Sequence, residues 1–171
     1  IRINTLIDDQ PICEVDFNAN HLRLVLALKT NEYAGDTPYE DICHEAGVAS
    51  RDMVKRFLTV AMGADNESSG RKALYQEGFD NIFINRIYQG VQKRYPKLEL
   101  FSGWGIFAQN FEGQILKDVM LEGIKEDIVC IPVHDAVAVQ QQHQTWAKEV
   151  MLETWREHMD GVKTKVKVDF P

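Results

Sequence analysis

The sequence has few cysteines, no long apolar run and no repeated segment, and each absence excludes a class of protein. Its three cysteines are Cys13, Cys43 and Cys130, which are widely spaced and form no CxxC pair. This argues against a disulfide framework or a zinc site and favours a reducing, cytoplasmic environment. No apolar run approaches the roughly 20 residues that a membrane-spanning helix requires, so we expect no membrane partner.

Positive charge is also scarce. The chain of 171 residues has 19 Lys and Arg against 26 Asp and Glu, which gives a formal net charge of -7. This balance argues against a nonspecific nucleic-acid coat protein and still allows a local basic cleft. The length fits one globular domain of ordinary size. Because no signal peptide opens the chain and Ile1 is not an initiator Met, we expect the numbering to begin inside a longer protein.

Apolar periodicity predicts few strands and many helices. The expected strands are 11–17, a hairpin within 128–140, and a final strand over 162–170. The expected helices are 21–29, a short one after the loop 31–40, one over 51–62 capped by Ser50 and stopped at Gly63, one over 71–95 that Pro96 ends, one over 103–125, and one over 141–159, with a polar loop at 63–70. We therefore predict an α+β fold, an antiparallel sheet with helices packed on one face.

The hairpin sequence IPVHDAVAVQ places His134 and Asp135 between two short apolar runs. An Asp at a turn is ordinary, because its side chain bonds the local backbone. A neighbouring His is less ordinary. Taken alone, the pair is better explained as a turn Asp with a bystander His.

Asp16 also lies where an apolar strand ends. If strand 11–17 lies beside the hairpin, Asp16 and Asp135 emerge at one sheet edge, and a divalent metal would relieve their repulsion. A pair of Mg²⁺ ions held there could bind a triphosphate, with Arg51 and Lys55, one helical turn apart, facing its phosphates. Without the other residues, a solvated helix face is the preferred explanation for these two cations.

Four motifs in order resemble those of family-A (Pol I-like) DNA polymerases. DFNANHLR at 16–23 is similar to motif A, RDMVKRFLTVAMG at 51–63 to motif B, QNFEGQILKDVM at 109–120 to the Gln-containing helix, and VHDA at 133–136 to motif C. The resemblance covers nearly the whole chain as a palm and shortened fingers. It implies an antiparallel palm-type sheet, with palm segments at 1–50 and 104–171 and a small helical fingers-like subdomain at 51–103.

The resemblance implies a set of site residues. Asp16 and Asp135 would be the catalytic pair and would hold two Mg²⁺ ions, or Mn²⁺ in their place, with the Phe17 carbonyl as a further ligand. Nucleotide contacts would come from Arg51, Lys55 and His21, and primer–template contacts from Arg23, Gln109 and His134. The implied partners are primer–template DNA, deoxynucleoside triphosphates, and a further domain or subunit supplying the thumb. The reduced form suggests a phage-like or other mobile origin.

The chain also departs from the family pattern. His21 stands where the family has a Glu that helps exclude ribonucleotides, and Ala136 replaces the Glu of motif C. Thr59 occupies the place of the aromatic residue of motif B that stacks on the base, and Gly63 stands near the Tyr of that motif. These changes motivate a second hypothesis, a catalytically degenerate palm that binds DNA or protein. A metal-dependent nuclease using the same two Asp residues is a third hypothesis.

Other charged groups have simpler explanations. His44, His143 and His158 show no metal-ligand spacing and are expected at the surface. The basic residues Arg71, Lys72, Lys93, Arg94 and Lys97 suit either a nucleic-acid backbone or a solvated helix face. The lysines of the final strand, Lys163, Lys165 and Lys167, are expected to keep an edge strand soluble rather than to bind anything.

Overall fold

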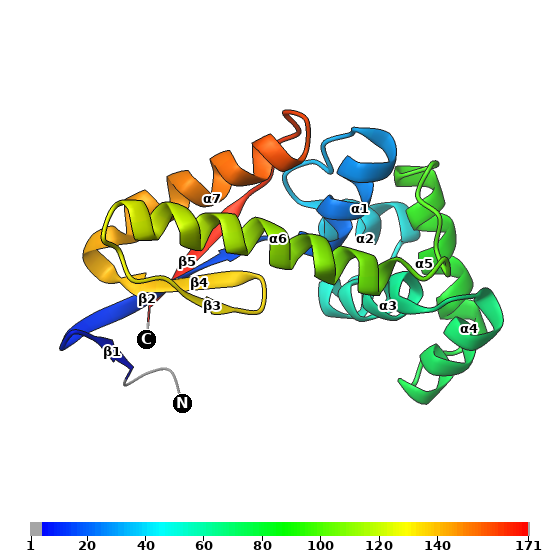
Figure 1. The fold of residues 1–171 in the computed structure, drawn as a ribbon. Helices are drawn as coiled ribbons and strands as arrows, with labels where there is room; N and C mark the ends of the chain where they lie inside the picture. The colour runs from blue at the N-terminus through cyan, green and yellow to red at the C-terminus, as the bar shows by residue number, and fades with distance from the viewer. Residues whose placement is uncertain (1–4, 171) are drawn as a thin grey trace. The chain divides into compact units, whose positions relative to one another are not determined.

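A computed structural model describes residues 5–170 and has an α+β fold, as predicted (Figure 1). The described strands are β1 (Leu6–Ile7), β2 (Gln10–Phe17), β3 (Ile131–Val133), β4 (Ala136–Gln140) and β5 (Val166–Asp169). The described helices are α1 (Asn20–Thr30), α2 (Pro38–Ala46), α3 (Arg51–Gly63), α4 (Glu67–Gln76), α5 (Asn81–Arg94), α6 (Trp104–Lys125), the short 3₁₀ helix η2 (Gln141–His143) and α7 (Gln144–His158). None of these helices combines the length and the apolar character needed to cross a membrane.

The chain divides into two compact units, which we describe separately. One unit comprises residues 1–20 and 110–171 and contains the sheet. The other is the continuous stretch 21–109 and is helical. The predicted division at 50/51 and 103/104 is a division by motif; in the structure α2 packs on α5 and α3, within the helical unit.

In the sheet unit, β2 is the central strand and every pairing is antiparallel. It pairs with β1 and β5 and, through residues 12–16, with β4, which continues through a tight turn to β3. The predicted 128–140 hairpin and its pairing with the first apolar strand are therefore present. A second hairpin, β1–β2, turns at Asp8 and Asp9, both with positive φ (51° and 60°), as a type I′ turn requires.

Alternation along β2 gives its two faces different chemistry. Cys13, Val15 and Phe17 are buried, and the Phe17 ring lies 5.3 Å from that of Trp155 on α7. These residues therefore point toward α7, which contacts β2, β4 and β5. Since successive side chains of a strand point to opposite faces, Glu14 and Asp16 belong to the face away from α7.

The core of the helical unit is formed where α2, α3 and α5 meet. Val54, Phe57 and Leu58 of α3 are completely buried, as their helical spacing predicted. Helices α2 and α5 approach so closely that a Cβ added at Gly90 would lie 2.8 Å from the Ala46 backbone nitrogen. This contact joins two helices that are well separated along the sequence.

The predicted helix over 71–95 is wrong in its extent, and so is the predicted loop over 63–70. Helix α4 begins inside that loop, where the Asn66 side chain accepts a hydrogen bond from the Ser69 amide. The chain then breaks at Gly78, whose φ of 87° suits glycine, and Asp80 caps α5 by accepting from the Phe83 amide. Two N-caps and one left-handed glycine therefore divide the predicted single helix into α4 and α5, despite its regular apolar spacing.

Candidate active site

Asp16 and Asp135 are brought together on adjacent strands of the sheet unit. Asp16 pairs in register with Ala136, the residue after Asp135, and the Phe17 amide donates a 3.1 Å hydrogen bond to the Asp135 carbonyl. The two aspartates are 119 positions apart in sequence and yet lie at the same end of the β2–β4 pair. The sequence predicted a shared site only if the two strands are adjacent. The pairing of β2 with β4 meets this condition.

The turn between β3 and β4 consists of His134 and Asp135. Val133 pairs with Ala136, so only two residues connect the strands. His134 is exposed and has φ of 53°, a left-handed conformation that is costly for a residue with a Cβ. The backbone strain at this turn is therefore located at a residue of the candidate site.

The Asp16 carboxylate has one paired oxygen and one unpaired oxygen. Its Oδ2 lies 3.1 Å from the Lys167 ammonium, and Lys167 is also the register partner of Asp16 on β5. Its Oδ1 is buried and meets no hydrogen-bond donor among the described residues. A buried carboxylate oxygen without a donor is costly, and it is the kind of atom that a cation would satisfy.

Lys167, one of the lysines expected only to keep the final strand soluble, has partners within the chain. Its ammonium contacts Asp169 Oδ2 at 2.7 Å as well as Asp16. The hydrogen bonds that it donates to Asp169 and then Asp16 raise the pKa of this lysine above its usual value. The sequence shows an alternating lysine strand, but only the β2–β5 register brings one of these lysines to Asp16.

A divalent ion fits the residues present only in part. Among residues 5–170, no group of three or more His, Cys, Asp or Glu side chains is placed to hold a metal. Mg²⁺, however, commonly uses one or two carboxylates and keeps waters or substrate phosphates as its other ligands. Asp16, with its unpaired Oδ1, and Asp135 therefore suit such an open site, and the Phe17 carbonyl is the further candidate ligand.

The other predicted site residues belong to the helical unit. His21 is partly buried, while Lys55 and Gln109 are exposed, on α3 and α6 respectively. Arg51 at the start of α3 donates to Glu40 at 2.8 Å and lies over the Tyr39 ring at 5.0 Å. A phosphate would have to compete with Glu40 for this guanidinium.

Arg23 has surroundings that suit a scaffold role. The side chain is buried, with its guanidinium 5.4 Å from the centre of the Tyr33 ring, and its Nη2 donates to the Asp36 carbonyl at 3.4 Å. A residue so enclosed organises the loop that follows α1. Direct contact with a primer–template is less compatible with this burial.

His158 differs from the surface position expected for it. Its side chain is 21% exposed, its Nε2 lies 2.8 Å from Asp118 Oδ2, and its ring packs edge-on against Phe111. By contrast, the His44 side chain is 87% exposed, as expected. The His158–Asp118 pair joins α7 to α6.

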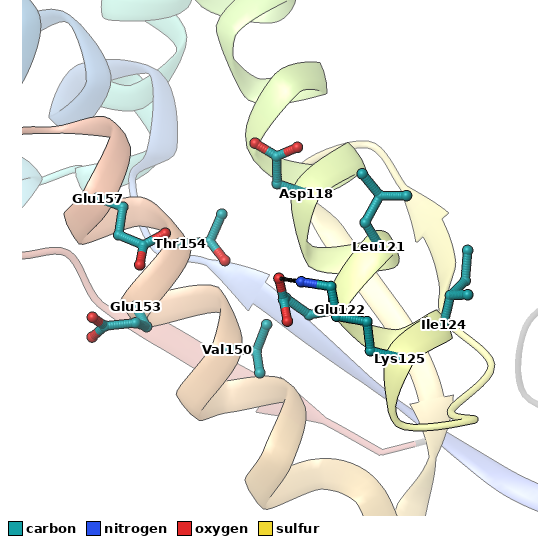
Figure 2. Close-up of a pocket in the computed structure, with 9 residues that line it drawn as sticks. All are labelled: Asp118, Leu121, Glu122, Ile124, Lys125, Val150, Glu153, Thr154 and Glu157. Atoms are coloured by element: carbon teal, nitrogen blue, oxygen red, sulfur yellow. Dashed lines mark hydrogen bonds and ion pairs between the residues drawn. The ribbon is translucent and has the colours of Figure 1, made fainter.

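A cavity of about 720 Å³ lies between α6 and α7 and contains none of the predicted site residues (Figure 2). Its walls carry Asp118 and Glu122 from α6 and Glu153 and Glu157 from α7. Among the described residues of its lining, Lys125 is the only basic one, and it donates a 2.6 Å hydrogen bond to Glu122. The acidic pairs at spacing four are visible in the sequence and are the signal that could have predicted this lining. Such a lining repels nucleic-acid phosphates.

The three cysteines do not add a nucleophile to either region. Cys13, Cys43 and Cys130 are free thiols, and burial raises the pKa of each above its usual value. A raised pKa keeps a thiol protonated and unreactive near neutral pH.

Neither a scan against protein-family models nor a search of curated proteins finds a match for this chain. Function is therefore inferred from the motifs and from the geometry around Asp16 and Asp135.

Proposed function

We propose that the chain is the catalytic module of a template-directed DNA polymerase. The observation that carries this proposal is the pairing of β2 with β4, which puts Asp16 beside the turn that holds Asp135 and leaves Asp16 Oδ1 without a donor among the described residues. Two carboxylates at one sheet end are the ligands that two-metal nucleotidyl transfer needs. The order of the four motifs supports the same reaction class.

In the proposed reaction, the 3′-hydroxyl of a primer loses its proton to water, and its oxygen forms a bond to the α-phosphorus of a deoxynucleoside triphosphate. The bond from that phosphorus to the bridging oxygen breaks, and pyrophosphate leaves. Asp16 and Asp135 would hold two Mg²⁺ ions, which supply charge stabilisation for the attacking and leaving oxygens. Arg51 and Lys55, one turn apart on α3, would bind the triphosphate once Arg51 releases Glu40.

Primer extension in Mg²⁺ tests this function directly. Asp16→Asn and Asp135→Asn should each lower the extension rate by about a thousandfold or more, since each removes a charge that holds the metal. Glu149→Gln, on the exposed side of α7, is the matched control and should extend primers at the parent rate. Equal extension by both aspartate variants and the parent contradicts the proposal.

The resemblance covers a palm and fingers, and a further domain or subunit would supply the thumb. Primer extension by the chain alone is therefore measured together with nucleotide binding. Calorimetry with a deoxynucleoside triphosphate should show binding that requires Mg²⁺ or Mn²⁺ and that Asp16→Asn abolishes. This measurement does not depend on a domain that grips the duplex. Binding that is equally strong in a chelator also contradicts the metal-dependent mechanism.

A non-catalytic palm-like module is the second candidate, and two observations favour it. Lys167 already neutralises one oxygen of Asp16, and the acidic cavity between α6 and α7 has the exposed apolar side chains of Leu121 and Ile124 at its edge. Such a cavity suits a basic amphipathic peptide better than it suits DNA. This candidate predicts no metal-dependent nucleotide binding in the same calorimetry.

A further inference from the structure

The contacts of Lys167 point to a role that goes beyond solubility and that rests on the proposed function. We propose that the Lys167 ammonium competes with the divalent ion for Asp16 and that Asp169 receives this ammonium when the ion binds. Lys167 is thus a positioning residue that sets the metal affinity of the site. The chemical class of ligand is a hard divalent cation, Mg²⁺ or Mn²⁺.

The geometry supports competition at a single carboxylate. Lys167 lies directly across from Asp16 in the β2–β5 register, so its side chain shares the sheet face of Asp16. The Nζ atom is 3.1 Å from Asp16 Oδ2, while the neighbouring Oδ1 is buried. A cation bound at Asp16 would therefore sit within a few ångströms of the ammonium, and two positive charges at that separation repel.

Asp169 is a second ion-pair partner for Lys167. It is two residues away on the same strand, and its Oδ2 is closer to Nζ (2.7 Å) than the Asp16 oxygen is (3.1 Å). When the Lys167 ammonium gives up its contact with Asp16, it therefore keeps its ion pair with Asp169. The Lys167 side chain is 52% exposed, so it can change partners without opening the core.

The two neighbours of Lys167 predict opposite effects on metal affinity. Lys167→Gln removes the competing charge and should tighten Mn²⁺ binding by about three- to tenfold, on the scale of one partly exposed ion pair. Asp169→Asn leaves Asp16 as the main anchor of the ammonium and should weaken Mn²⁺ binding by about two- to fivefold. In the Lys167→Gln background, Asp169→Asn should have a much smaller effect, because the ammonium through which it acts is gone.

Mn²⁺ titration of the full chain, followed by the loss of the free-ion electron paramagnetic resonance signal, measures these affinities without an activity assay. Lys163→Gln is the matched control, because it removes the same charge outside β5 and should leave the affinity unchanged. Asp16→Asn shows that the signal comes from this site. A thermal melt of each variant verifies that it is folded.

The outcomes separate this inference from the proposed function. Tighter binding by Lys167→Gln, unmatched by Lys163→Gln, supports the competition. Equal Mn²⁺ affinity in the parent and Lys167→Gln overturns the inference and leaves the polymerase proposal standing. Absence of Asp16-dependent binding in both the parent and Lys167→Gln overturns both.

Discussion

Tyr95 shows how a single buried hydroxyl stabilises the helical unit. The residue is 3% exposed, and its hydroxyl donates a 2.5 Å hydrogen bond to the buried Ala34 carbonyl. The pKa of Tyr95 is raised to about 12, chiefly by burial of the side chain. The side chain therefore joins the loop after α1 to the end of α5 in its neutral form.

Tyr95→Phe should lower the free energy of unfolding by about 1–3 kcal/mol at pH 7, because the Ala34 carbonyl loses its donor. The parent should also lose stability as the pH rises from about 10, the pKa of tyrosine in the unfolded chain, through about 12, since the folded state retains the proton longer. Urea unfolding across this range should show a shallower decline for Tyr95→Phe.

Tyr75→Phe is the control, because Tyr75 is 45% exposed. It should keep the alkaline decline of the parent. Identical pH dependence in Tyr95→Phe and the parent would show that Tyr95 does not cause this decline.

The β3–β4 hairpin combines a strained turn with a candidate catalytic residue. His134→Gly should raise the free energy of unfolding by up to about 1 kcal/mol, because glycine adopts a positive φ without steric cost but loses more entropy on folding. The same variant should extend primers more slowly if the imidazole contacts the primer. Urea unfolding and primer extension on one preparation measure both effects.

Asp127→Gly is the control for this variant. Asp127 has a similar φ of 56° in the turn after α6, so a comparable gain in stability is expected with unchanged extension. A His134→Gly variant that is less stable than the parent contradicts the assignment of strain to this turn.

Individual helices and strands could be predicted from the sequence where caps and apolar spacing within the element itself mark them. Helix α3 was predictable because Ser50 caps it, accepting from the Met53 amide, and because its apolar face has regular spacing. The hairpin was predictable from two apolar runs around His134 and Asp135. The break at Gly78 was missed because the buried Phe79, Ile87 and Val91 have helical spacing on its C-terminal side, and that spacing does not mark where the helix begins.

What the sequence could not predict depends on register and on distant partners. The Asp16–Lys167 pair requires the alignment of β5 on β2, and a shift of one residue would turn Lys167 to the other face. Similarly, the contact of Gly90 with Ala46 assigns α2 to the helical unit, and no local signal marks it. Asp16 and Asp135 were predicted from motifs, whereas the position of the Lys167 ammonium between Asp16 and Asp169 was not predicted.

For the whole molecule, the division into a continuous and a discontinuous unit makes a prediction about independent folding. Residues 21–109 contain their own buried set, including Phe57, Ile84 and Val91, each completely buried. Expressed alone, this segment should show a helical circular dichroism spectrum and one cooperative thermal transition. A broad, noncooperative melt would contradict its independence.

The position of β2 in the chain has a consequence for synthesis on the ribosome. Its partners β4 and β5 are encoded near the other end, since residue 15 pairs with residues 137 and 168. The nascent chain therefore presents residues 12–17 of β2 without either of these two partners while the intervening helices emerge and begin to fold. We expect aggregation during expression to originate from this segment, and slower translation to prolong its exposure.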